Sequence, residues 1–457
     1  MKIGLAGWGV ETISAYHFFG NDHEYVICNE EPRDDYPTGP NISLHFIDTP
    51  RTPGLVGNVT NLSYFDPLLE CEKIVIVTPA RKNLEKHFGL DNPIWDKVTD
   101  AERIFFEQSP TKNIIGVTGT KGKGTTSTLI FNMLKEEGKH VLLGGNIGKT
   151  PLDFMRELTK DSWVVLELSS FQLYKFPYSP HIAVHLMMMP EHIEEWHKTM
   201  DDYVESKRNI FAHQNENDFA IFYPKNEYSV RNVTFSKGTH IPYTETPGAY
   251  VDENGFLCIG PECIVHKSEF KLLGEHNVQN ICAAVSAVWQ TRVSVESVKK
   301  VVTSFAGLEH RLELAGEVNS VKYYDDSFGT TPDTAIVAMD AFSQQKVVIV
   351  GGHEKGNSME KLAKRLAGDD ILFAICIGLI GKKIYDLAIS AGMSPDKLCV
   401  REDGNSWTMK EIIDLARSRA EAGDIVLLST GSSSFGIFKD YKDRGNQFKQ
   451  VVKQLIL

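Results

Sequence analysis

Short apolar runs alternate with helix-like stretches along most of the chain, and turn residues follow nearly every run. Val, Ile and Leu dominate the runs, which indicates strands buried on both faces. The stretches between them, such as 127–134 and 203–211, have the apolar spacing of helices. Strands that alternate with helices predict an α/β fold with parallel sheets. The predicted strands lie at 2–6, 25–28, 73–77, 113–117, 141–143, 163–166, 181–189, 321–324, 346–350 and 425–428.

The first predicted strand runs into a glycine-rich turn, Gly7-Trp8-Gly9, and then into a helix-like stretch. This turn has the G-x-G-x-x-G pattern, except that Thr12 replaces the third glycine. A second strand ends at Asn29-Glu30, which such folds place near a ribose, and a third leads into Thr78. The layout predicts a Rossmann-type domain that binds a nucleotide diphosphate. A doubly wound domain that binds no nucleotide is the alternative.

A second glycine-rich turn follows the strand at 113–117 and leads into a helix, which is the context of a phosphate-binding loop. Backbone N–H groups in such a turn surround an anion, and Lys123 can reach the outer phosphates of ATP. Gly124 stands where a hydroxyl residue usually binds magnesium, so Thr125 is the favoured metal ligand. A surface loop without a ligand is the alternative. The predicted ATP-binding residues here are Gly119, Thr120, Lys121, Gly122, Lys123, Gly124, Thr125 and Thr126.

Polar residues follow three apolar strands downstream of this loop. Glu167 ends one strand, where a carboxylate can hold the magnesium ion that bridges ATP phosphates. Asn146 lies in a glycine-rich turn after another strand, and His192 follows a third. Lys207 lies in the next helix-like stretch. Each residue alone also has a purely structural interpretation: Glu167 as a solvated carboxylate at a strand edge, His192 as a packed side chain, and Lys207 as part of a solvated helix face.

The pattern after about residue 315 predicts a second substrate-binding module. Ligands of an open α/β sheet bind at the carboxyl ends of its strands, and small or polar residues follow three strands here. These segments are Asp325-Asp326-Ser327, Gly351–Gly356 and Ser429–Ser434.

Composition narrows the class of protein. The 457-residue chain has a net charge of −12, which disfavours nucleic-acid binding but not small anionic substrates, because local cations can reverse the field in a cleft. The seven cysteines form no C-x-x-C pair, so we expect reduced thiols rather than a zinc site or disulfides. No apolar run has the length of a membrane span, so we expect a soluble, cytoplasmic protein without membrane insertion. The length predicts two to four domains.

The order and spacing of these motifs resemble those of the Mur ligase family over nearly the whole chain. Gly144–Gly148 together with Glu167–Gln172 is most similar to the branch that adds D-glutamate. The resemblance implies an α/β protein with a Rossmann-like domain at 1–95, a central P-loop ATPase-like domain with a mostly parallel sheet at 96–310, and a C-terminal Rossmann-like domain at 311–457. The other motifs that carry it are Gly119–Thr126, His192 with Lys207, His276-Asn277 with Asn280, His310-Arg311, Asp326-Ser327, Gly351–Gly356 and Arg444-Gly445.

The resemblance implies an ATP-dependent amide ligase of peptidoglycan precursor synthesis. Its substrates would be UDP-N-acetylmuramoyl-L-alanine and D-glutamate, coupled through an acyl phosphate. ATP, two Mg²⁺ ions and a carbamylated Lys207 are the implied cofactors, and a monomer is the expected state.

The resemblance also implies residues for each site. The catalytic residues would be Lys123, Glu167, His192 and Lys207. The metal ligands would be Thr125, Glu167, His192 and carbamylated Lys207. Further ATP contacts would come from Asn280, Arg311 and Asp326. The nucleotide substrate would contact Gly7, Trp8, Gly9, Asn29, Thr78, Asn146, Ser169 and Gln172. The glutamate would contact Thr330, Lys355, Ser434 and Tyr441.

Two residues depart from the pattern of this branch in the C-terminal region. Phe328 stands where relatives usually carry a lysine, and Thr331 stands where they carry an asparagine. Loss of a cation beside the glutamate pocket predicts weaker binding of the side-chain carboxylate or a different acceptor. The alternatives are a related Mur or folylpolyglutamate-type ligase with another amino-acid acceptor, such as L-glutamate, and a nucleotide-binding regulator without catalysis.

Overall fold

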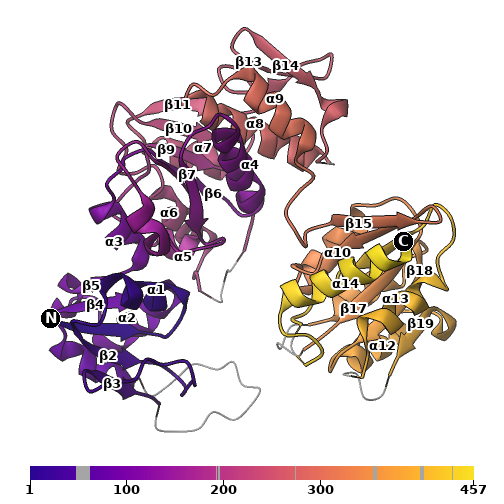
Figure 1. Cartoon of the computed structure of the whole chain (residues 1–457), viewed down its shortest axis with the longest axis horizontal. Helices are drawn as coiled ribbons and strands as arrows, with labels where there is room; N and C mark the ends of the chain where they lie inside the picture. Colours follow the sequence, from indigo (N-terminus) through magenta and orange to yellow (C-terminus); the bar gives the residue numbers. More distant parts are fainter. Residues whose placement is uncertain are drawn as a thin grey trace. The chain divides into compact units, whose positions relative to one another are not determined.

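Figure 1 shows the computed structural model, which describes residues 1–47, 62–191, 193, 196–272, 274–353, 358–401, 406–434 and 436–456. The chain forms two compact units, of which the first ends at Phe305 and the second begins at Ala306. The first unit holds two parallel sheets and a small antiparallel sheet, and the second holds one mainly parallel sheet. These three large sheets confirm the predicted α/β fold. The domain limits at 95/96 and 310/311 remain predictions.

The N-terminal sheet has the strand order β3-β2-β1-β4-β5, with all strands parallel. The order reverses at β1, which pairs with β2 on one edge and β4 on the other. Crossover connections diverge at such a switch point and leave a crevice at the carboxyl ends of the strands. The sheet therefore places a ligand site after β1 and β4. Its elements are β1 (Lys2–Ala6), α1 (Val10–Phe19), β2 (Glu24–Cys28), β3 (Ile42–His45), β4 (Lys73–Ile76), α2 (Arg81–Phe88) and β5 (Val98–Thr99).

The central sheet is also parallel, with the order β11-β10-β9-β6-β8-β7. β6 leads into the predicted phosphate loop, and its neighbours β8 and β9 end on either side of that loop. The elements of this region are α3 (Ala101–Gln108), β6 (Ile114–Thr118), α4 (Lys123–Glu136), β7 (Val141–Gly145), β8 (Trp163–Glu167), α5 (Ser170–Leu173), β9 (Ile182–His185), α6 (Met200–Arg208), β10 (Phe219–Phe222), α7 (Glu227–Val233), β11 (Thr239–Pro242), α8 (Glu275–Trp289) and α9 (Val295–Ser304).

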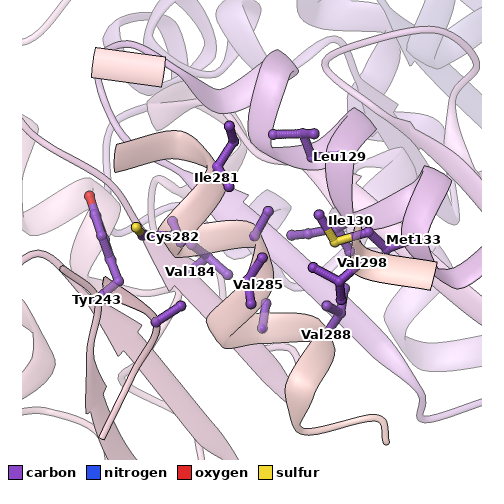
Figure 2. Packing of buried hydrophobic residues seen from close by; sticks show 14 of the residues in the cluster. Leu129, Ile130, Met133, Val184, Tyr243, Ile281, Cys282, Val285, Val288 and Val298 are labelled. Carbon is purple, nitrogen blue, oxygen red and sulfur yellow. The ribbon is translucent and has the colours of Figure 1, made fainter. Parts of the chain in front are cut away.

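Helices α4 and α8 pack together over one face of this sheet (Figure 2). Ile130 and Met133 of α4 lie in the same buried cluster as Ile281, Val285 and Val288 of α8, at the helical spacing of three and four residues. Complete burial of each such side chain contributes about 1.5–3 kcal/mol. The packing fixes α4, whose first turn closes the phosphate loop.

Residues 215–270, whose polar, turn-rich sequence gave no assignment, contribute β10 and β11 to the central sheet, with α7 between them, and then form a separate antiparallel sheet. This small sheet consists of β12 (Tyr250–Val251), β13 (Phe256–Ile259) and β14 (Glu262–His266). Cys258 and Cys263 face each other across the β13–β14 hairpin and form a disulfide. The expectation of reduced thiols is therefore wrong for this pair, because hairpin register, not C-x-x-C spacing, brings the two sulfurs together.

The C-terminal sheet has the order β15-β16-β20-β17-β18-β19, and only the β15–β16 pair is antiparallel. Helices α10, α11 and α12 cover one face, and α13 and α14 cover the other. The elements are β15 (Glu313–Val318), β16 (Val321–Asp325), α10 (Pro332–Asp340), β17 (Lys346–Gly351), α11 (Glu360–Leu366), β18 (Ile371–Ile377), α12 (Gly381–Ser390), β19 (Leu398–Val400), α13 (Met409–Arg417), β20 (Ile425–Leu428) and α14 (Tyr441–Ile456).

Short 3₁₀ helices connect several of these elements, and no helix in the described ranges is both long and apolar enough to cross a membrane. The 3₁₀ helices lie at Ser63–Glu70, Thr78–Ala80, Pro93–Asp96, Pro151–Glu157, Lys267–Glu269 and Pro395–Lys397.

Candidate active site

The predicted phosphate loop has the backbone of an anion-binding turn. Gly119 and Gly122 have φ values of +148° and +87°, a region that side chains of L-residues rarely adopt. A Cβ atom on Gly122 would also lie 2.2 Å from Asn280 Oδ1, so this position requires glycine. Helix α4 begins at Lys123 and directs its first N–H groups and the positive end of its dipole at the loop. The loop can therefore cradle a phosphate group.

Two lysines meet at this loop. The Lys123 Nζ donates to Gly119 O at 3.0 Å and to Thr120 O at 2.9 Å. The Lys207 Nζ, from helix α6, also donates to Gly119 O at 2.9 Å, and to Thr118 Oγ1 at 3.1 Å. Lys207 is only 1% exposed, and its burial, followed by the charge of Lys123, lowers the pKa of Lys207 well below its usual value. A buried, readily deprotonated amine therefore lies against the phosphate loop.

Glu167 ends β8 beside the strand that leads into the loop, and it is buried. Asn146 Nδ2 donates to Glu167 Oε1 at 2.8 Å, and the Asn146 N–H donates to Glu167 O at 2.9 Å. The amide thus orients one carboxylate oxygen, and the other has no hydrogen bond to Asn146. Carboxylate oxygens are preferred ligands of Mg²⁺, so the donor chemistry of Glu167 fits a magnesium site next to the phosphates.

The hydroxyl groups of the loop have different surroundings. Thr120 Oγ1 donates to Met189 O and also bonds Tyr203 OH at 3.0 Å, so it is used inside the fold. Thr126 is fully buried, and its hydroxyl lies 3.5 Å from Asn280 Oδ1 on helix α8. Thr125 is partly exposed. Of the other loop residues, Gly122 and Lys123 are partly exposed, Lys121 is exposed and Gly124 is buried. The exposure leaves Thr125 as the accessible hydroxyl. His192 lies outside the described residues.

Ser169 and Gln172 form a capping box at the start of α5. Gln172 Oε1 accepts hydrogen bonds from the Ser169 N–H at 2.9 Å and the Ser169 hydroxyl at 3.0 Å. Gln172 Nε2 donates to Glu102 Oε1 at 2.6 Å. Glu102 lies far away in the sequence, and no local pattern marks it, so sequence analysis missed it.

The crevice of the N-terminal sheet contains a pocket of about 360 Å³. Gly7 lines it with a φ of +85°, and a Cβ there would meet Val77 at 2.4 Å. Asn29 also lines the pocket, but its side chain accepts from the Trp8 N–H and donates to Glu31 O and Tyr36 OH. Sequence analysis missed the aromatic and cationic side chains of the lining. The remaining lining residues are Glu30, Glu31, Arg33, Tyr64, Phe65, Val77, Pro79, Ala80 and Asn83.

Three other predicted residues of this site help to build it. Trp8 is 5% exposed and packs against Tyr36, and Gly9 caps helix α1. Thr78 is buried, and its N–H and hydroxyl both donate to the carboxylate of Glu11, at 2.7 and 2.9 Å. Thr78 therefore anchors the loop after β4, and both of its donors are taken up by Glu11.

The second unit brings Asp326 to the carboxyl end of β16. Asp326 accepts hydrogen bonds from the Ser429 hydroxyl at 2.6 Å and from the Leu312 N–H at 3.3 Å. Burial raises the pKa of Asp326 to about 7. The buried Arg444 guanidinium donates to Ser327 O at 2.8 Å and to Ser432 O at 3.2 Å, which ties the segments after β16 and β20 together.

Arg311 and Phe328 form a stacked pair in the same unit. The Arg311 guanidinium carbon lies 3.9 Å from the centroid of the Phe328 ring, and Tyr441 meets that ring edge-on at 5.1 Å. Phe328 is 40% exposed. The Phe328 ring thus holds a guanidinium on its face.

The other residues predicted for the C-terminal site occupy several segments. Thr330 lies before α10 and is partly exposed, and Ser434 lies after β20 and is buried. Tyr441 is the first residue of α14, and its backbone oxygen accepts a hydrogen bond from the Ser327 hydroxyl. Lys355 lies outside the described residues.

Two family models match the chain. Residues 117–288 match the Mur ligase middle domain, and residues 310–432 match the Mur ligase glutamate ligase domain. A UDP-N-acetylmuramoylalanine–D-glutamate ligase of Clostridium tetani is 34% identical, over 86% of this chain and 85% of its own. The chain belongs to the Mur ligase family. A ligase with the same name from Clostridium acetobutylicum is 36% identical, over 78% of this chain and 77% of its own.

Solved structures of Mur ligases share the fold. MurF of Thermotoga maritima, in complex with ADP, has a TM-score of 0.55 at 16% identity and covers 99% of this chain and 95% of its own. MurC of Thermotoga maritima has a TM-score of 0.56 at 15% identity and covers 99% of both chains. As a Mur ligase, the protein is an ATP-dependent acid–amino-acid ligase of peptidoglycan precursor synthesis.

Proposed function

We propose that this Mur ligase adds D-glutamate to UDP-N-acetylmuramoyl-L-alanine and converts ATP to ADP and phosphate. The observation that carries the proposal is the extended sequence similarity to ligases named for this reaction. The arrangement of Lys123, Lys207 and Glu167 around the phosphate loop supports the ATP-dependent half of the reaction.

The chemistry explains why ATP is needed. A carboxylate is a poor electrophile, so the alanyl carboxylate first attacks the γ-phosphorus, which forms an acyl phosphate and releases ADP. The amine of glutamate then attacks the acyl carbon, loses a proton and expels phosphate, so that an amide bond forms. Lys123 and the backbone N–H groups of the loop would stabilise the negative charge on the transferred phosphoryl group.

The donor set around the loop fits a magnesium site. Glu167 would hold the first ion, with Thr125 as the accessible hydroxyl, and His192 would hold the second. When bound, Mg²⁺ offsets the charge of the phosphates. Asn146 would keep the Glu167 carboxylate oriented through the hydrogen bond at 2.8 Å.

We also propose that Lys207 is carbamylated. Its Nζ and that of Lys123 donate to the same carbonyl, so two full cations would repel each other in a buried place. The neutral amine of Lys207 would attack the carbon of CO₂, form an N–C bond and release one proton. The product carries a negative charge, which would attract Lys123 and support the metal site.

The remaining residues divide between the substrates. The N-terminal pocket would hold the UDP group, with Gly7, Trp8, Gly9, Asn29 and Thr78 in or around it. Ser169 and Gln172 would contact the muramoyl-alanine part. In the second unit, Arg311 and Asp326 would contact ATP together with Asn280 of the first. Thr330, Lys355, Ser434 and Tyr441 would contact the amino acid.

Phosphate release tests the proposal directly. The enzyme would be incubated with ATP, Mg²⁺ and UDP-N-acetylmuramoyl-L-alanine, and D-glutamate would be compared with L-glutamate and a panel of other amino acids. We expect release only with D-glutamate. Release with none of the amino acids would contradict the proposed nucleotide substrate.

Phe328 supports one second candidate, a ligase for another acceptor such as L-glutamate. The exposed ring replaces the cation that the family resemblance places beside the glutamate pocket, and Arg311 is stacked on it. Phosphate release with L-glutamate but not with D-glutamate would favour this candidate. The Phe328→Lys variant would then gain activity with D-glutamate.

A further inference from the structure

Glu102 is a buried carboxyl group that the reaction described above does not use. It lies in the first turn of α3 and is 1% exposed. Its Oε1 accepts a hydrogen bond from Gln172 Nε2, and its Oε2 has no hydrogen-bond partner among the described residues. A buried carboxyl with one unsatisfied oxygen destabilises a fold, and an apolar side chain of similar size would avoid that cost. Folding alone therefore gives no reason for a glutamate at this position.

The hydrogen bonds of Gln172 fix the orientation of its side-chain amide, with the oxygen facing Ser169 and the nitrogen facing Glu102. The Ser169 N–H can only donate, so it selects the amide oxygen of Gln172. The Glu102 oxygen accepts, so it selects the amide nitrogen at the opposite end. Without Glu102, the nitrogen end would lose its partner, and Ser169 alone would hold the amide. The Gln172–Glu102 hydrogen bond uses one of the two Nε2 hydrogens, and the second remains for an acceptor in the substrate.

Charged side chains lie at the start of α3, the helix that carries Glu102. Asp100 caps α3 by accepting from the Arg103 N–H at 2.8 Å, and its carboxylate lies 3.0 Å from the Arg103 side chain and 3.5 Å from that of Arg81. Burial, followed by the charges of Glu11 and Asp100, raises the pKa of Glu102 well above its usual value. A neutral acid with its proton on Oε2 still accepts through Oε1, so the contact with Gln172 is compatible with either protonation state.

We propose that Glu102 is a positioning residue for the nucleotide substrate: it holds the Gln172 amide so that one N–H is directed to an oxygen of the muramoyl-alanine part. The inference rests on the proposed substrate role of Ser169 and Gln172. Glu102 touches no substrate itself, and it acts through Gln172.

The test compares Glu102→Leu with Glu102→Gln and with a matched control on the same helix, Glu107→Leu. Glu107 is exposed and bonds only Tyr178 in the described contacts, so its replacement repeats the chemical change without touching Gln172. We expect Glu102→Leu to raise the KM for UDP-N-acetylmuramoyl-L-alanine about tenfold or more, with unchanged KM values for ATP and the amino acid. Glu102→Gln, which keeps an acceptor oxygen, and Glu107→Leu should stay within about twofold of the wild type.

A second variant keeps the inference testable if Glu102→Leu fails to fold. In the double variant E102Q/Q172E, the amide of residue 102 donates to the carboxylate of residue 172, so the internal hydrogen bonds remain. Position 172 then has no N–H for the substrate. We expect a thermal stability near that of the wild type and a KM for the nucleotide substrate that is still raised about tenfold.

The outcomes separate this inference from the proposed function. Wild-type enzyme without turnover on UDP-N-acetylmuramoyl-L-alanine would overturn the proposed function and, with it, the substrate role of Gln172. Active wild-type enzyme, together with an unchanged nucleotide KM in Glu102→Leu, would overturn only the role of Glu102. An unchanged nucleotide KM in the double variant would contradict the substrate contact of the Gln172 N–H, and with it the role of Glu102. An equal rise of all three KM values would assign Glu102 to general structure and likewise contradict the inference.

Discussion

At the scale of single residues, the phosphate loop is organised by the contact of two lysines with one carbonyl oxygen. We expect Lys207→Ala to lower kcat at least about a hundredfold, because the carbamate that we propose on Lys207 would be lost. A short-chain carboxylic acid or high bicarbonate in the assay should restore part of the activity by supplying an anion at the same place. Lys207→Arg provides the control, since it keeps a cation and cannot be carbamylated. Full activity in Lys207→Ala would contradict the carbamate.

Asp326 gives a prediction for stability as a function of pH. Burial raises its pKa from 3.8 to about 7 in the folded protein, so the folded state binds more protons than the unfolded state between these values. Stability should therefore fall as the pH rises from about 4 to 7 and then level off, with a contribution of up to about 4 kcal/mol. Asp326→Asn should raise the melting temperature at pH 8 more than at pH 5. An equal shift at both pH values would contradict the raised pKa.

Sequence analysis found residues whose chemistry is marked by neighbours in the chain. Lys123 follows glycines after a strand, and Glu167 ends an apolar run, so the sequence alone marks both as candidates. Glu102 could not be predicted, because its partner Gln172 is 70 residues away and only the fold joins them. The same holds for Cys258 and Cys263, since their pairing depends on the register of a hairpin.

At the scale of secondary-structure elements, β6, the loop and α4 form one unit in which glycine conformation decides function. We expect Gly122→Ala to weaken ATP binding at least about tenfold, because its Cβ would lie 2.2 Å from Asn280 Oδ1. Gly138→Ala, just after the other end of α4, is the matched control. Gly138 has a similar φ of +80°, and a Cβ there would meet nothing within 4 Å.

Both variants should lose about 1–2 kcal/mol of stability from the left-handed backbone conformation, but only Gly122→Ala should lose affinity for ATP. Isothermal titration with a non-hydrolysable ATP analogue and thermal unfolding would measure the two effects. Equal affinities of the two variants would show that the contact between the loop and α8 does not shape the nucleotide site.

The strands themselves were the most predictable elements. Strands that are buried on both faces consist of nearly continuous apolar residues, so their sequence pattern depends little on the rest of the fold. Examples are β6, β8, β9 and β17. The sheet of β12, β13 and β14 was not predicted, because its short antiparallel strands are half exposed and interrupted by turns.

At the scale of the whole molecule, the reaction that we propose requires groups from both compact units. The phosphate loop belongs to the first unit, whereas Arg311, Asp326 and Thr330 belong to the second, which begins at Ala306. In the proposed reaction, phosphoryl transfer to a carboxyl oxygen precedes amine attack at the carbon of the same carboxyl group, so the proposal requires groups of both units to act on one substrate. We therefore expect ATP analogue and UDP-N-acetylmuramoyl-L-alanine together to reduce the radius of gyration measured by small-angle X-ray scattering. At ligand concentrations close to the wild-type Kd, Gly122→Ala should contract less than the wild type does, because it would bind less of the ATP analogue, whereas Gly138→Ala should respond like the wild type. Identical scattering of the wild type with and without ligands would contradict ligand-driven closure.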